Sequence, residues 1–192
     1  KRQALDKIFE HTDVEGVFHF AAESHVDNSI SGPRVFVDTN VIGTFNMLEY
    51  VRKSSNCRFL HVSTDEVYGA LTETGPSFTE TMRLEPNNVY SATKASADLL
   101  VRSYHRTYGL DVVTTRCCNN YGPRQDMEKL IPKVISNALN NISIPVYGQG
   151  ANIREWIHVY DHCTGIKAVF DRGETNEIYN IGSGIEVTNI DL

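Results

Sequence analysis

The sequence predicts an α/β fold: a parallel, Rossmann-like sheet with helices on both faces, followed by a smaller α/β domain. Short, nearly continuous apolar runs, typical of strands buried on both faces, alternate with stretches in which apolar residues recur every three or four positions, as in amphipathic helices. Strands and helices that alternate in this way form a parallel sheet through right-handed crossovers. Because the alternation loosens after residue 118, we expect a first domain at 1–118 and a second at 119–192.

The first domain is expected to place two helices between its strands. Residues 33–53 carry apolar side chains at helical spacing, and residues 89–108 form a second helix that ends at Gly109, a residue that caps helices well. The polar stretch 69–88, which contains Gly and Pro, is too long to be a simple connection. The predicted strands cover residues 16–22, 57–63 and 111–118.

The second domain is expected to lie over the carboxyl ends of these strands. Ligands of parallel α/β sheets bind beyond those ends, so the residues after Ala22, Ser63 and Cys118 are expected to line one crevice. The elements predicted after residue 119 are a helix at 128–140, a strand near 145–147, another near 155–158, a helix to about residue 170 and a strand at 177–181.

The composition indicates a globular chain and argues against nucleic acid as a partner. The 192 residues include 18 Lys and Arg against 24 Asp and Glu, a net charge of −6, and 41% of them are hydrophobic. A phosphate backbone is held by clustered basic side chains, and no such cluster occurs in this sequence. The sequence also lacks an apolar run long enough to span a bilayer and shows no secretory signal, so no membrane association is expected.

The cysteines and histidines do not predict a metal site. The four cysteines, at 57, 117, 118 and 163, lack metal-ligand spacing, and neighbours such as 117 and 118 make a poor structural disulfide. Unpaired thiols are typical of a reducing compartment, so we expect a cytoplasmic protein. Structural hydrogen bonding is the favoured interpretation of His25, His158 and His162.

A Tyr and a Lys one helical turn apart begin the second predicted helix. Tyr90 and Lys94, in the segment YSATK, lie on one helix face because they are four positions apart. An ammonium near a phenol favours the phenolate and lowers the pKa of the Tyr, which could then act as a general base. The short motif alone is a weak signal, since such pairs also occur by chance.

A hydroxyl and two carboxyl groups follow the second predicted strand. Thr64, Asp65 and Glu66 stand where that strand ends. Two adjacent carboxyls in a closed site can hold one protonated and one ionised group, which provides an acid and a base. An isolated Thr-Asp-Glu is more often a solvated turn in which the Asp caps. Its occurrence beside the Tyr-Lys pair, at the ends of neighbouring strands, favours a catalytic role.

Seven segments together resemble a known family. The chain is similar, from Gly16 to Leu192, to the extended short-chain dehydrogenase/reductase family, and closely resembles its dTDP-glucose 4,6-dehydratase branch. The segments that carry the resemblance are, in order, AAESHVDNSI, STDEVYG, YSATK, NNYGP, PVYGQG, IREWIHVYDH and YNIG.

The resemblance implies a lyase of nucleotide-sugar metabolism that uses NAD. It would convert a nucleoside-diphosphate glucose, with dTDP-glucose favoured, to the 4-keto-6-deoxy sugar nucleotide of deoxysugar biosynthesis. Tyr90 would take the proton of the 4-hydroxyl while hydride passes to NAD, and Lys94 would assist the Tyr and hold the nicotinamide ribose. Thr64 would hydrogen-bond near the same hydroxyl. Glu66 would remove the C5 proton and a protonated Asp65 would donate to the departing 6-hydroxyl, after which hydride returns to C6.

The resemblance also implies binding residues for NAD and for the sugar nucleotide. Besides Tyr90 and Lys94, those for NAD are Phe20, Ala21, Ala22, Glu23, Ser24, Thr39 and Asn120. Those for the sugar and diphosphate are Ser24, Thr64, Asn119, Glu128, Lys129, Leu130 and Arg154, with Asn189 a weaker candidate near the chain end. Pro145, Val146 and Tyr147 would lie against the nucleotide base, although a core position is as good an interpretation of Tyr147.

The sequence departs from the family at its ends. The family opens with a strand and a Gly-rich turn that holds the cofactor pyrophosphate, and this sequence contains no such turn. We expect the chain to be an internal piece of a longer enzyme, truncated at both ends and itself inactive; a naturally shortened, non-catalytic sugar-nucleotide-binding remnant is the alternative. Among enzymatic functions, the alternative to a dehydratase is an epimerase or decarboxylase of the same family. The sequence does not separate dTDP-glucose from UDP-glucose as the substrate.

The resemblance finally implies a homodimer. The helices at 33–53 and 89–108 would pair with their copies in a four-helix bundle.

Overall fold

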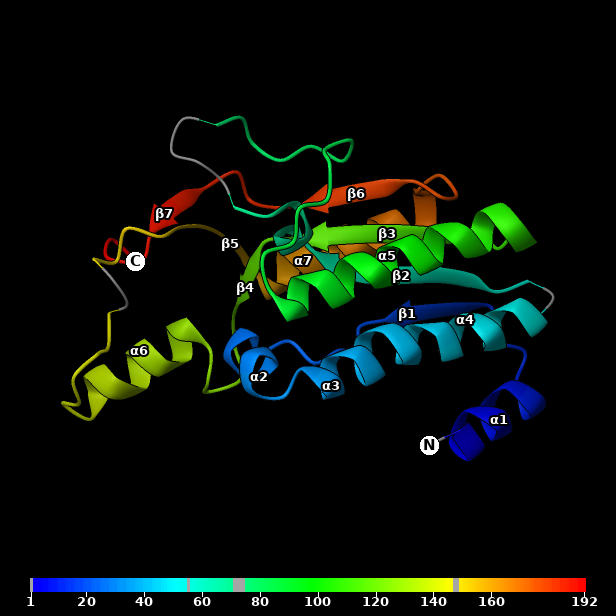
Figure 1. The fold of residues 1–192 in the computed structure, drawn as a ribbon, viewed down its shortest axis with the longest axis horizontal. Coiled ribbons are helices and arrows are strands. Elements are labelled where there is room, and N and C mark those ends of the chain that lie inside the picture. Colours follow the sequence, from blue (N-terminus) through cyan, green and yellow to red (C-terminus); the bar gives the residue numbers. More distant parts are fainter. Residues whose placement is uncertain (1, 55, 71–74, 147–148) are drawn as a thin grey trace. The chain divides into compact units, whose positions relative to one another are not determined.

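The computed structural model describes residues 2–54, 56–70, 75–146 and 149–192 (Figure 1). Its contacts divide the chain into two compact units. The first comprises Lys1–Arg116 and Lys167–Asn180, and the second comprises Cys117–Ile166 and Ile181–Leu192.

The first unit is built on the predicted Rossmann-like sheet. Its strands follow the order β1-β2-β3-β6, and β1 and β2 are parallel, with Gly16 opposite Arg58 and His19 opposite His61. A parallel pair needs a crossover connection, which the helices between the two strands provide. The strands are β1 (Gly16–His19), β2 (Arg58–Thr64), β3 (Val112–Cys117) and β6 (Ile178–Ile181).

Helices cover both faces of this sheet. Figure 1 shows α4 (Gly43–Lys53) and α5 (Val89–Tyr108) in front of the strands and the end of the orange α7 (Val159–Arg172), which belongs to this unit from Lys167 on, behind them. Phe170, near the end of α7, stacks on Phe18 of β1 with ring centroids 4.2 Å apart. The core on the other face is a cluster of fully or almost fully buried side chains from α4, β2, α5 and β3: Leu48, Val51, Phe59, Val101 and Val112. The two-faced covering explains why the strands are near-continuous apolar runs.

The predicted helix at 33–53 forms, but it changes character along its length. It begins as α3 (Pro33–Phe36), continues as the π-helical turn η1 (Val37–Ile42) and ends as α4. π-helical turns are rare and often lie at functional sites. The turn places the side chain of Asn40 inside the unit, where it is 1% exposed.

The helix α5 begins and ends where the sequence predicted. Asn88 caps it: the Asn88 side-chain oxygen accepts a hydrogen bond from the Ser91 backbone N–H (2.8 Å), and the Ser91 hydroxyl accepts one from the Asn88 N–H (3.2 Å). This reciprocal capping box satisfies two otherwise unpaired donors. Gly109 ends the helix in the left-handed region, with φ at 72°. None of the helices in the described parts of the chain is long and apolar enough to cross a membrane.

The second unit has a smaller sheet in the order β4-β5-β7. The strands β4 (Asn119–Tyr121) and β5 (Ile153–His158) are parallel, and β5 and β7 (Glu186–Thr188) are antiparallel. The predicted helix at 128–140 is α6 (Leu130–Leu139), and the predicted strand near 155–158 is β5.

Several expectations need correction. The strand predicted at 16–22 ends at His19, and Pro145 and Val146 lie outside any strand, while Tyr147 lies outside the described residues. β1 pairs with β2 only as far as His19, so apolar character alone extended the prediction too far. The helices α1 (Arg2–His11) and α2 (Val26–Ser31) and the short strands β4 and β7 were not predicted.

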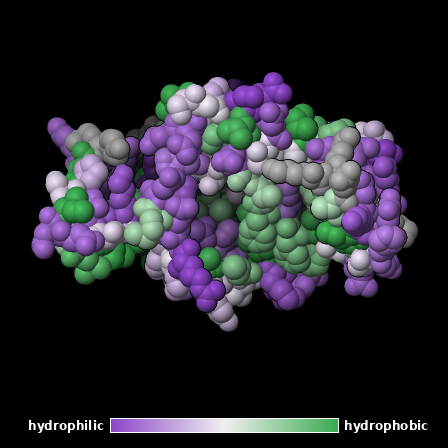
Figure 2. Space-filling view, turned by 90° about the horizontal axis from the view of Figure 1, so that it is seen from below, coloured by the Kyte–Doolittle hydropathy of each residue, from purple (hydrophilic) through white to green (hydrophobic). Residues whose placement is uncertain are grey.

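Apolar side chains are exposed on the predicted dimerisation helices. Figure 2 shows the lower face of Figure 1, where hydrophobic residues emerge in patches between hydrophilic ones. Large apolar residues that are 40% exposed or more include Val35, Val37 and Ile42 of the helical stretch 33–53 and Leu99 of α5. Large exposed apolar patches on a protein surface often mark a site of interaction with another protein.

The buried His19 connects β1 with α4. Its Nε2 lies 3.0 Å from the Thr44 hydroxyl, which itself donates to the Asn40 carbonyl at 2.7 Å. The hydroxyl has one proton, so His19 is the donor and carries its hydrogen on Nε2. Burial, with smaller contributions from His61 and Lys94, lowers the pKa of His19 to about 3.

We predict that the stability of the protein falls as the pH drops below 6.5, in part because of His19. The unfolded chain takes up a proton near pH 6.5, whereas folded His19 takes one up only near pH 3. This stabilisation is complete above pH 6.5 and is lost between pH 6.5 and 3; from pH 7 to pH 5 the loss is about 2 kcal/mol. Urea unfolding at several pH values measures it.

The His19→Gln variant should show a shallower pH dependence than the unsubstituted protein by about that amount. His11→Gln, which changes an exposed histidine at the end of α1, is the matched control. Equal pH slopes for His19→Gln and the unsubstituted protein would contradict the assignment.

Candidate active site

Five predicted catalytic residues lie in the first unit, where β2 ends and α5 begins. Thr64 is the last residue of β2, and Asp65 and Glu66 open the 3-10 turn η2 (Asp65–Tyr68). The Thr64 hydroxyl accepts from the Glu66 backbone N–H (3.3 Å) and lies 3.2 Å from an Asp65 carboxyl oxygen, to which it donates. The turn is therefore fixed at its start by the residue that ends the strand.

The Tyr-Lys pair begins the facing helix. Lys94 is 4% exposed, and its ammonium donates to the Val62 carbonyl of β2 at 2.6 Å. Tyr90 lies one turn earlier on the same helix face. A buried ammonium anchored at the carboxyl end of β2 is in place to stabilise negative charge on a group that approaches from Tyr90.

The cap of α5 reaches one of the two carboxyls. The Asn88 side-chain nitrogen donates to Glu66 Oε2 at 3.2 Å, while the oxygen of the same amide caps the helix that carries Tyr90. Glu66 is thus oriented both through its backbone N–H and through its carboxylate. One amide ties the helix with Tyr90 to the turn with Asp65 and Glu66.

The buried Asn40 is a positioning residue that the sequence analysis missed. Its side-chain amide makes two hydrogen bonds with the backbone of Glu23: it accepts one from the N–H (2.8 Å) and donates one to the carbonyl (3.0 Å). The same amide also donates to the Thr93 hydroxyl (2.9 Å). It therefore connects the predicted cofactor segment, residues 20–24, with α5. The available signal was a polar residue next to Thr39 in a helix that carries apolar residues at helical spacing.

A buried cluster of charged groups lies further along α5. Asp98 is 5% exposed; its carboxylate is 3.0 Å from Arg116 Nε of β3 and 3.4 Å from His61 Nε2 of β2. Burial alone would raise the pKa of Asp98, but the contacts with His61 and Arg116 outweigh it and the pKa is lowered. The pKa of His61 is lowered by burial and by Lys94, so the ion pair is Asp98 with Arg116.

The second unit carries the other predicted binding residues. Asn119 and Asn120 form β4, and the Asn120 amide donates to the Cys118 carbonyl at 3.2 Å while its buried Oδ1 has no hydrogen-bond partner among the described residues. Lys129 is the N-cap of α6, with Glu128 before it and Leu130 after it. Arg154 is exposed in β5, and Asn189 donates from its backbone to the Asn152 carbonyl at 3.0 Å. Pro145 and Val146 are exposed.

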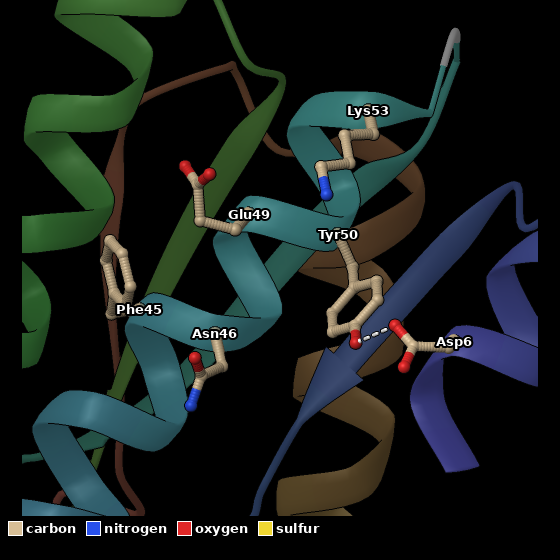
Figure 3. A pocket seen from close by; sticks show the side chains of 6 residues that line it. All are labelled: Asp6, Phe45, Asn46, Glu49, Tyr50 and Lys53. Carbon is tan, nitrogen blue, oxygen red and sulfur yellow. Dashed lines mark hydrogen bonds between the residues drawn. The ribbon is translucent and has the colours of Figure 1, made fainter. Parts of the chain in front are cut away.

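A pocket in the first unit lies apart from the predicted residues (Figure 3). It lies between α1 and α4, and its side chains already make structural contacts: the Tyr50 hydroxyl donates to Asp6 at 2.5 Å, and Glu49 accepts from the Tyr104 hydroxyl at 2.8 Å. The lining residues are Asp6, Phe45, Asn46, Glu49, Tyr50 and Lys53. The pocket therefore belongs to the packing of α1 on α4.

Comparison with known proteins gives consistent matches over the whole chain. A family model described as GDP-mannose 4,6 dehydratase matches residues 1–192. A dTDP-glucose 4,6-dehydratase of Streptomyces antibioticus is 53% identical over 180 residues, which cover 94% of this chain and 53% of that relative. The chain thus spans about half the length of this relative.

The chain is also similar to solved structures. A dTDP-glucose 4,6-dehydratase of Streptomyces venezuelae, DesIV, solved as a double mutant with NAD and DAU bound, matches with a TM-score of 0.94 and 51% identity over 100% of this chain and 58% of its own. A UDP-glucuronic acid 4-epimerase of Bacillus cereus, in complex with UDP-glucuronic acid and NAD, matches with a TM-score of 0.91 and 26% identity over 97% of this chain and 59% of its own.

We predict that replacing the Asn88 cap with Ala lowers the free energy of unfolding by about 1 kcal/mol, because the N-terminus of α5 loses its acceptor. Asn88→Ser keeps a good capping oxygen and should lower it far less. Urea unfolding followed by circular dichroism measures both. Equal losses for Ala and Ser would show that the amide stabilises the protein through Glu66 instead of through the helix.

Proposed function

The chain belongs to the family described as GDP-mannose 4,6 dehydratase, and from this premise we propose that the protein containing it dehydrates a nucleoside-diphosphate glucose to the 4-keto-6-deoxy sugar nucleotide. We take dTDP-glucose as the substrate because relatives near 50% identity carry the name dTDP-glucose 4,6-dehydratase. The observation that carries the proposal is the link from Glu66 through Asn88 to the helix of Tyr90 and Lys94. It joins an acid-base pair to a Tyr-Lys pair within one compact unit.

Each of the proposed catalytic residues has a separate role in the reaction. Tyr90 removes the proton of the 4-hydroxyl, and the buried ammonium of Lys94 stabilises the resulting phenolate. Thr64 hydrogen-bonds the oxygen at C4. The ketone at C4 acidifies the C5 proton, which Glu66 takes, while Asp65 gives a proton to the departing 6-hydroxyl, so that water leaves across C5 and C6.

When bound, NAD would supply reversible hydride transfer, which the oxidation at C4 and the reduction at C6 require. The residues of the first unit suit its nicotinamide end. Asn40 holds the backbone of Glu23 and so fixes the segment from Phe20 to Ser24, and Lys94 is anchored nearby on the helix that Asn40 also contacts. We propose that this segment, with Thr39 and Lys94, holds the cofactor, with Asn120 as a further contact.

We propose that the second unit binds the sugar nucleotide. Support comes from its supply of polar groups: Asn119 on β4, Lys129 at the start of α6 and the exposed guanidinium of Arg154, whose planar fork suits diphosphate oxygens. The remaining proposed contacts are Ser24, Glu128, Leu130, Pro145, Val146, Tyr147 and Asn189. We propose that residues 1–118 mainly bind NAD and that residues 119–192 mainly bind the sugar nucleotide. The two parts interleave, because residues 167–180 belong to the first unit.

An epimerase of the same fold is the second candidate. The match to the UDP-glucuronic acid 4-epimerase favours it, because that enzyme shares the fold at 26% identity. Epimerisation at C4 needs a base for the 4-hydroxyl but no acid and base for loss of water. The Asp65–Glu66 pair, with Glu66 held by Asn88, therefore favours dehydration.

We further propose a cytoplasmic homodimer. The four cysteines, all within the described residues, form no disulfide, as is usual in a reducing compartment. The exposed apolar side chains of Val35, Val37, Ile42 and Leu99 support pairing of the helices 33–53 and 89–108 with their copies in a four-helix bundle.

We predict that Asp65→Asn and Glu66→Gln each reduce formation of the 4-keto-6-deoxy product from dTDP-glucose by about 10²- to 10⁴-fold, because each removes a proton-transfer group. The full-length protein that contains this chain is assayed by product analysis. Glu85→Gln, which changes an exposed carboxylate of the following loop, should leave the rate unchanged. Undiminished turnover of a UDP-sugar epimer by both site variants would instead support an epimerase.

We predict that Leu99→Glu dissociates the dimer, because the substitution places charge on a 56% exposed apolar position of the proposed bundle. Ile185→Glu is the matched control, since Ile185 is 66% exposed in the second unit. Sedimentation at micromolar concentration should give a dimer mass for the unsubstituted protein and the control, and a monomer mass for Leu99→Glu. A single-chain mass for the unsubstituted protein would contradict the proposed dimer.

A further inference from the structure

We propose that Arg116 is a positioning residue, which holds the turn of Asp65 and Glu66 at a fixed place relative to the helix of Tyr90 and Lys94. This inference rests on the proposed function, because the turn supplies the acid and base of the elimination. Arg116 itself lies on β3, outside both elements, and is 3% exposed.

The first contact of Arg116 is with α5. Asp98 follows Tyr90 and Lys94 at intervals of four and so lies on the same face of the helix. Its carboxylate receives the Arg116 Nε–H at 3.0 Å. Because both partners are almost completely buried, the pair is not screened by solvent, and loss of either partner would leave an uncompensated buried charge. The face of α5 that carries the Tyr-Lys pair is thereby tied to β3.

The second contact of Arg116 is with the catalytic turn. The guanidinium carbon lies 4.7 Å from the ring centroid of Tyr68, which is the last residue of η2 and is 5% exposed. A guanidinium over an aromatic face in a desolvated site is attracted by the quadrupole of the ring. Tyr68 is also held from its far side, where its hydroxyl donates to Asn180 at 2.8 Å and its ring stacks on Phe78.

Backbone hydrogen bonds also hold the turn. The Gly69 N–H donates to the Glu66 carbonyl at 3.2 Å, and the Glu85 N–H donates to the Val67 carbonyl at 3.0 Å. Thr64 fixes its start and Tyr68 fixes its end. Arg116 connects that end with Asp98 of α5, in addition to the packing of Val67 and Tyr68 against Ala95 of the same helix.

The alternative is a purely structural ion pair. A structural pair would affect stability and all steps of the reaction alike. A positioning pair would affect the elimination, which uses Asp65 and Glu66, more than the oxidation at C4, which uses Tyr90 and Lys94. A displacement of about 1 Å can cost on the order of 10²-fold in rate, so the two cases differ measurably.

The test uses Tyr68 variants of the full-length protein, because substitutions of Arg116 or Asp98 can prevent folding. Tyr68→Leu removes the ring beneath the guanidinium. Tyr68→Phe is the matched control, since it keeps the ring and removes only the hydroxyl bond to Asn180. Single-turnover experiments with dTDP-glucose follow C4 oxidation by the absorbance of the reduced cofactor and elimination by product formation.

The expected result is that Tyr68→Leu slows elimination about 10- to 100-fold while C4 oxidation stays within about twofold, and that Tyr68→Phe changes neither by more than about threefold. Equal slowing of both steps, or of neither, by Tyr68→Leu would overturn the inference. Loss of both steps in the unsubstituted protein would overturn the proposed function instead.

Amide hydrogen exchange tests the coupling without substrate. In Tyr68→Leu, exchange at the Glu66 and Gly69 amides should become faster, because the end of the turn loses the ring on which the Arg116 guanidinium packs. Tyr68→Phe, which keeps the ring, should have a smaller effect. Unchanged exchange at these amides in Tyr68→Leu would overturn the inference whatever the enzyme's activity.

Discussion

A buried carboxylate is the constraint on which the first unit depends. Asp98 is buried near the centre of α5, and an ionised group in that place is stable only when a partner compensates its charge. Arg116 of β3 provides the compensation and His61 of β2 lies against the second oxygen. Because the three groups come from α5, β2 and β3, their contacts fix the position of the helix on the sheet. That position sets where Tyr90 and Lys94 lie relative to the end of β2.

Amide side chains perform a similar task nearer the surface. Asn40 joins the segment after β1 to α5, and Asn88 joins the start of α5 to the turn after β2. Each uses both the donor and the acceptor of its amide, which fixes the orientation of two elements at once. The apolar core supplies most of the stability, and these polar contacts determine which loops meet at the carboxyl ends of the strands. The proposed chemistry takes place at those ends.

The sequence allowed prediction of the elements that depend on local signals. The helix 89–108 was predicted with its correct bounds, and Gly109 gave the signal for its end. The catalytic residues proposed at 64–66 were singled out because Thr64, Asp65 and Glu66 stand where an apolar strand ends, and the structure places Thr64 as the last residue of that strand. The apolar pattern does not encode strand pairing or tertiary packing. It therefore could not predict the end of β1, the π-helical turn, or that Pro145 and Val146 lie outside any strand. The roles of Asp98 and Arg116 were also beyond prediction, because the two residues are 18 positions apart and meet only in the folded unit.

The most direct test of the dehydratase account is the fate of the proton at C5. Incubation of the full-length protein with dTDP-glucose in heavy water should give a 4-keto-6-deoxy product that carries solvent deuterium at C5, because Glu66 removes that proton and solvent replaces it after water has left. A product that keeps its 6-hydroxyl and takes up no deuterium at C5 would contradict the account.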